Sequence, residues 1–176
     1  MKLIFSIFCC VFLLPVGDEV KMQWSEDRQL TWDDFQGTPD AGDSFVASTN
    51  SGISFSFSYQ TRNGKMKLKY EVLCNFYPEL SWYRPTMVSS YILKHEQTHF
   101  DISELFARKL RKAMAETQFS TQPKEEVNAL YNDIERQRRE MQQLFDLESD
   151  HSKNEEAELH WRKFVANELM KYDAYK

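Results

Sequence analysis

Two of the chain's four histidines, His95 and His99, stand four residues apart, and Glu96 directly follows the first. On an α-helix this spacing places both imidazoles on one face, one turn apart, so both can bind one zinc ion at about 2.0–2.1 Å. Glu96 lies about 100° further round the helix, where its carboxylate reaches a water molecule without binding the metal. The His-Glu-x-x-His pattern therefore predicts zinc as cofactor and Glu96 as the general base of a hydrolytic site.

A catalytic zinc usually has three protein ligands and one open position, so a third ligand is needed. Asp101 and Glu104 are the nearest acids, but on a helix they point about 120° and 180° away from His95. We therefore expect the ligand from elsewhere in the chain, and His151 is the preferred candidate because it immediately precedes the predicted start of the last helix.

Two glutamates in the first turn of that helix, Glu155 and Glu156, are the leading alternatives to His151. Three acids surround His151 in the sequence: Asp146, Glu148 and Asp150. One of them could accept a hydrogen bond from an imidazole N–H instead of binding the metal.

The hydrophobic pattern indicates which elements position these residues. Apolar and serine residues alternate over 53–59, a second alternating run covers 65–76, and Asn63-Gly64 between them predicts an antiparallel hairpin. From about residue 86 the apolar period becomes helical, with both histidines on the inward face. We expect two further helices, and the predicted fold class is α+β: an antiparallel hairpin packed on a zincin-like active-site helix and two C-terminal helices.

The two later helices have recognisable start signals. Pro123 is suited to the first turn of a helix, because proline lacks the N–H that this position leaves unpaired. Ser152 followed by Glu155 three residues later resembles a capping box, which predicts Ser152 as the N-cap of the last helix.

Length, charge and the N-terminus bound the class of protein. The chain has 176 residues and a net charge of −5 with scattered basic residues, so we expect one domain over 18–176 and no nucleic-acid partner. An uncharged apolar run fills most of residues 1–17, which favours a signal peptide. The alternative is that this segment is not cleaved and anchors the protein, and in either case we expect no other segment to contact a membrane. We therefore expect an exported protein, in the periplasm or the extracellular space. Cys74 would then be the one cysteine left, a buried hydrophobe.

The segment HEQTHFDISE, together with WSEDRQLTWDDFQG, ASTNSGISFSF and DLESDHSKNEEAELHW, resembles a bacterial family of predicted secreted zinc-dependent proteases, known mainly as a domain of unknown function. The resemblance spans about residues 22–170. It implies a zincin helix carrying His95, Glu96 and His99, and a late histidine that matches His151. Ser152 stands where we expect glycine to be common in the family.

The expected function is that of a secreted, monomeric zinc metalloprotease that hydrolyses peptide or protein substrates. Tyr83 or Tyr91 could donate a hydrogen bond to the developing oxyanion, although both also suit a hydrophobic core. The hairpin could offer a strand edge to an extended peptide. The alternative is an exported zinc-binding structural or peptide-binding envelope protein without catalysis.

Overall fold

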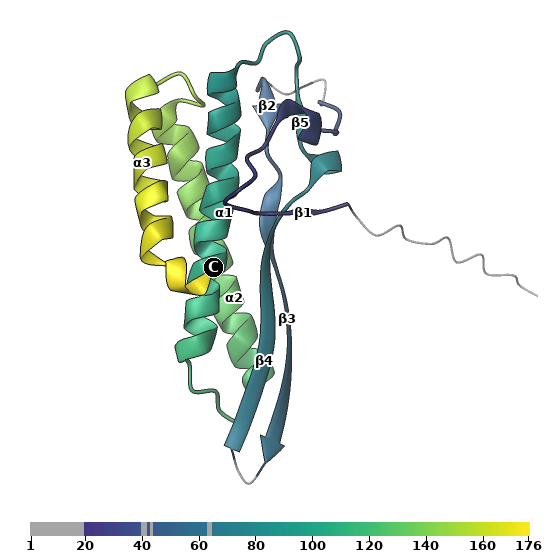
Figure 1. Cartoon of the computed structure of the whole chain (residues 1–176), viewed down its shortest axis with the longest axis vertical. Coiled ribbons are helices and arrows are strands. Elements are labelled where there is room, and N and C mark those ends of the chain that lie inside the picture. The colour runs from purple at the N-terminus through teal and green to yellow at the C-terminus, as the bar shows by residue number, and fades with distance from the viewer. Residues whose placement is uncertain (1–19, 40–41, 43, 63–64) are drawn as a thin grey trace, which may run out of the picture.

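The computed structural model of the protein describes residues 20–39, 42, 44–62 and 65–176. Five strands and three α-helices follow one another in this part of the chain: β1 (Met22–Gln23), β2 (Ala47–Ser48), β3 (Ser51–Arg62), β4 (Lys65–Phe76), β5 (Trp82–Tyr83), α1 (Ser90–Glu116), α2 (Pro123–Ser149) and α3 (Glu155–Lys171). Figure 1 shows the strands on one side of α1 and the other two helices on its opposite side. The predicted α+β class is confirmed.

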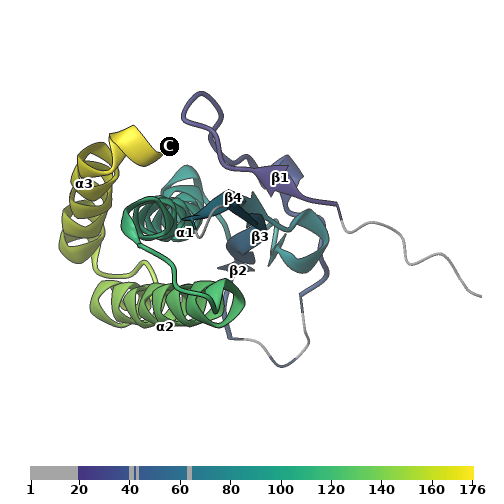
Figure 2. The same cartoon turned by 90° about the horizontal axis from the view of Figure 1, so that it is seen from below.

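Helix α1 is the centre of the molecule, and Figure 2 shows it surrounded by α2, α3 and the strands. The helix begins after Ser89, whose side chain accepts a hydrogen bond from the Ile92 N–H. Its apolar residues are almost wholly buried, because neighbours cover it on several sides: Ile102, Leu105, Phe106 and Leu110 are each no more than 2% exposed. A helix enclosed in this way holds its side chains in fixed positions.

The predicted hairpin is present as a long antiparallel pair. Ile53 lies opposite Cys74 and Phe55 opposite Val72, so the apolar residues share one face. Cys74 is buried as expected, and burial raises the pKa of its thiol. The pairing reaches Arg62 and Lys65, which fits a two-residue connection, although Asn63-Gly64 lies outside the described residues. Strand β1 pairs with β4, while β2 and β5 form a separate small sheet.

Helix α2 begins at Pro123, as the sequence predicts. The expectation for α3 is wrong by two residues: Asn154 is its N-cap and accepts a hydrogen bond from the Ala157 N–H. Ser152 cannot fill this position because its φ is 71°, whereas an N-cap residue needs an extended backbone. Asp150, His151 and Ser152 all adopt the left-handed conformation that non-glycine residues avoid.

The predicted signal peptide, residues 1–17, lies outside the described residues. Within the described ranges, no helix combines the length and the apolar character needed to cross a membrane.

Candidate metal centre

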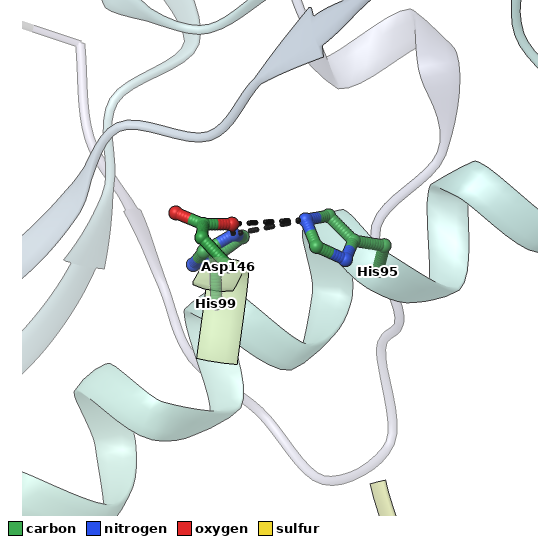
Figure 3. Close-up of side chains that lie close together, drawn as sticks. All are labelled: His95, His99 and Asp146. Atoms are coloured by element: carbon green, nitrogen blue, oxygen red, sulfur yellow. Dashed lines mark hydrogen bonds and ion pairs between the residues drawn. The ribbon is translucent and has the colours of Figure 1, made fainter. Parts of the chain in front are cut away.

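Three side chains from two helices converge at one point. His95 and His99 come from α1, and Asp146 comes from α2; Figure 3 shows them pointing toward one another. The two Nε2 atoms are 3.2 Å apart, and Asp146 Oδ1 lies 3.3 Å from His95 Nε2 and 3.0 Å from His99 Nε2. The three atoms thus form a nearly equilateral triangle.

This triangle has the size that a tetrahedral zinc requires. Zinc ligands at 2.0–2.2 Å that subtend a tetrahedral angle are separated from each other by about 3.3–3.6 Å. The three observed separations of 3.0–3.3 Å are within a few tenths of an ångström of that spacing. Two histidines and one carboxylate also match the ligand set of known catalytic zinc sites, which keep a fourth position open.

Hydrogen bonds on the far side of each imidazole direct the Nε2 lone pairs toward this point. His95 Nδ1 is bonded to the Glu158 carboxylate, and His99 Nδ1 to the side-chain oxygen of Gln142. Both partners are acceptors, because Gln142 uses its amide NH₂ to donate to the His99 carbonyl. In the neutral imidazoles the Nδ1 atoms therefore carry the protons, and three electron-rich atoms face one another, an arrangement that a proton or a metal cation stabilises.

Phe145, the residue before Asp146, fixes the planes of both imidazoles. Its ring is fully buried and lies 4.5 Å from the His95 ring, nearly parallel, and 5.0 Å from the His99 ring, edge to face. Gln142 and Asp146 are one turn apart on α2, just as the two histidines are on α1. The packing of Phe145 against α1 thus brings both polar residues of α2 to the histidines.

The charges around the site favour cations. Burial acts most strongly on His95 and opposes protonation, but hydrogen bonds to Asp146 and Glu158 and the charge of Glu96 outweigh it and raise its pKa to about 9. Burial tends to raise the pKa of Asp146, yet its contacts with His95 and His99 hold that pKa well below the usual value. The acceptors that attract a proton here would equally attract a divalent metal ion.

Glu96 lies beside the triangle without being part of it. The side chain is buried, with the residue only 4% exposed, and its Oε2 has no hydrogen-bond partner among the described residues. An unpaired buried carboxylate oxygen is costly, which indicates that a donor such as water completes it. Glu96 also lines the cleft that contains the triangle, so this oxygen can bind a water molecule there.

A cleft of about 570 Å³ opens over the site. Its lining comes from three parts of the chain: residues 44–49, the α1 residues that include Glu96 and the two histidines, and Asp146 with residues 151–153. Because Ile92 and Phe45 also line it, the cleft combines apolar surface with a few converging polar groups, as ligand sites commonly do.

His151 lies in the cleft but outside the triangle. Its side chain is 45% exposed, its Nδ1 is 3.7 Å from Asp146 Oδ1, and its ring packs 4.7 Å from that of Phe45. His151 as a metal ligand therefore stays a prediction, while the geometry favours Asp146 for the third position. Glu155 and Glu156, the alternatives, are exposed in the first turn of α3 and do not line the cleft.

The other acids near the motif have structural partners, as the helical geometry predicts. Asp101 accepts hydrogen bonds from Trp24 and Gln97. Glu104 is buried in ion pairs with Arg108 and Arg111. Neither carboxylate belongs to the metal triangle.

Two suggestions about substrate contacts need correction. Tyr83 packs on Trp32 at the edge of the core, and Tyr91 lies beneath Arg162. Neither tyrosine lines the cleft, so the geometry does not favour either as an oxyanion donor. The hairpin strands likewise contribute no residue to the cleft; the strand beside it is β2. These contacts depend on how distant segments pack, which the hydrophobic pattern does not encode.

Sequence reasoning missed Gln142 and Glu158 and gave Asp146 only a supporting role. A signal did exist for two of them: Gln142 and Asp146 flank buried Phe145 with helical spacing, which places two polar side chains beside an apolar seam. For Glu158, only its place one turn before Trp161 and Arg162 hinted at the buried face of α3.

Residues 78–152 match the model of a bacterial protein family of unknown function, DUF922. The match covers less than half of the chain and runs from before β5 to the loop that carries His151. It supports the resemblance to a bacterial family over a shorter span than 22–170, and its description names no activity. No curated protein and no solved structure matches the chain.

Proposed function

We propose that the protein is an exported zinc-dependent peptidase whose metal is held by His95, His99 and Asp146. The observation that carries the proposal is the convergence of two imidazole nitrogens and a carboxylate oxygen at the spacing of zinc ligands, beside a buried glutamate with a free oxygen. This combination of ligands and base matches metal-assisted hydrolysis.

The chain's own residues account for the proton transfers. Zinc, when bound, polarises a carbonyl group and makes water more acidic. Glu96 would take a proton from the attacking water as the new C–O bond forms. It would then pass that proton to the amine nitrogen as the C–N bond breaks, leaving a free carboxylic acid and an amine. A peptide is thus hydrolysed without any further reactant.

The part of the cleft lining at residues 44–49 supports an extended peptide as substrate. Strand β2 pairs with β5 on one side, where Ala47 faces Tyr83 and Ser48 faces Trp82. No other described strand pairs with β2, and both of its residues line the cleft, so its second edge is our candidate for binding a peptide. Backbone groups of an extended peptide can pair with such an edge and so lie across the metal.

Replacing Glu96 with glutamine tests the proposal, because glutamine keeps the shape of the side chain and removes the base. Zinc-loaded wild type and Glu96→Gln would be incubated with a peptide mixture of varied sequence, and new N-termini counted by mass spectrometry. We expect cleavage by the wild type, loss of at least about 100-fold in the variant, and equal zinc content in both. Equal zinc content with no cleavage by either protein would instead support the zinc-stabilised binding protein.

A further inference from the structure

A buried glutamate on α3 contacts one of the candidate zinc ligands on the side of its imidazole that faces away from the metal site. Glu158 is fully buried, and its Oε1 is hydrogen-bonded to His95 Nδ1. Helix α3 buries few side chains, and Trp161 and Val165 are the others. A carboxylate in such a position is unusual, because burial without full pairing is unfavourable.

The second oxygen of Glu158 is incompletely paired. Oε2 has no hydrogen-bond partner in the described part of the chain, and Arg162 Nε lies 3.7 Å away. The charge of the carboxylate must therefore be balanced largely through His95, whose Nε2 faces the metal triangle on the opposite side of the ring. A divalent cation there would polarise the imidazole and strengthen the Nδ1–H···Glu158 bond.

We propose that Glu158 is a positioning residue: it holds His95 with the proton on Nδ1 and thereby couples metal binding to the packing of α3. The inference rests on the zinc site of the proposed function and extends it to a residue outside the ligand set. His99 is held differently, by the neutral amide of Gln142. Only the His95 side therefore carries a charge that links a third helix to the metal.

The coupling between zinc binding and the packing of α3 must be reciprocal, because one coupling free energy describes the effect of each on the other. Zinc should tighten the packing of α3 by the same factor by which Glu158 raises zinc affinity. Partners of this kind typically contribute 10–100-fold to metal affinity.

Glu158→Gln tests the inference, with Glu148→Gln as matched control. The control removes an acid of α2 that accepts a hydrogen bond from Trp161 Nε1 on α3 and does not belong to the metal triangle. Zinc affinity would be measured by competition with a chromophoric chelator. We expect 10–100-fold weaker binding in Glu158→Gln and less than about 3-fold in the control.

Two spectroscopic readouts separate positioning from a merely structural effect. In the wild type, the His95 Nδ1 proton should appear downfield in nitrogen-correlated NMR spectra and should move upfield in Glu158→Gln. Hydrogen exchange of the α3 amides should slow on addition of zinc in the wild type and in the control, but not in Glu158→Gln. If Glu158→Gln does not fold, Glu158→Asp retains the charge but shortens the reach and should weaken zinc binding similarly.

The possible failures are distinguishable. A wild type that binds no zinc would overturn the zinc site itself. A wild type that binds zinc, with Glu158→Gln indistinguishable from Glu148→Gln in affinity, NMR and exchange, would overturn the role of Glu158 alone.

Discussion

The third zinc ligand is either Asp146, as the geometry favours, or His151, as the sequence predicted. Comparing Asp146→Asn with His151→Ala distinguishes these two alternatives. Asp146 Oδ1 lies 3.0 and 3.3 Å from the two Nε2 atoms, within a few tenths of an ångström of the separation in a tetrahedral site. The His151 side chain is 45% exposed and stands outside this group. Asp146→Asn keeps the volume of the side chain and removes the charge that a cation needs.

The loss of a direct ligand should exceed the 10–100-fold effect typical of residues that only orient ligands. We therefore expect zinc affinity to fall by more than about 100-fold in Asp146→Asn, or more than about 2.7 kcal/mol, and by less than about 10-fold in His151→Ala. The assay is chelator competition at constant pH, and Asp150→Asn on the same loop is the control for lost surface charge. A larger loss in His151→Ala than in Asp146→Asn would refute the reasoning and make His151 the ligand.

Two further predictions concern stability. Ser152 has a φ of 71°, a left-handed conformation that glycine adopts without strain. Ser152→Gly should therefore stabilise the protein by about 0.5–1 kcal/mol in chemical denaturation, because the relief of strain exceeds the added freedom of the unfolded chain. A loss of stability would show that a contact of the serine side chain contributes more than the strain costs. In zinc-free protein, the pKa of His95 is raised to about 9, so its stabilisation is complete below about pH 6.5 and is lost as the pH rises through 9. The free energy of unfolding of zinc-free protein should thus fall by on the order of 2 kcal/mol between pH 6.5 and 9. Zinc affinity should rise over the same range, because protons no longer compete with the metal for His95. A stability that increases with pH in this range would contradict the raised pKa of His95.

The hydrophobic period of the sequence was sufficient to predict the helix that carries the His-Glu-x-x-His motif and the hairpin before it. His95 and His99 share a face with buried Ile102 and Phe106, so the helical period that predicts α1 also places both imidazoles inward. Alternation likewise predicted the long hairpin, because one of its faces packs on the core and the other is rich in serine.

Contacts between elements were beyond the same reasoning. Asp146 reaches the histidines because Phe145 packs between them and Trp161, a tertiary arrangement that no spacing along the chain reveals. The start of α3 was misplaced because three consecutive left-handed residues extend the turn to Asn154, and nothing about Ser152 as a residue type indicates a positive φ. The strand beside the cleft is only two residues long, too short for an alternating pattern to show.

The most direct test of the zinc site is anomalous diffraction at the zinc absorption edge from crystals of the zinc-loaded protein. We predict one peak per chain, about 2.0–2.2 Å from Nε2 of His95, Nε2 of His99 and a carboxylate oxygen of Asp146, with its fourth position open to the cleft. No peak at this point, or a zinc ion closed in by four protein side chains, would contradict a catalytic metal centre.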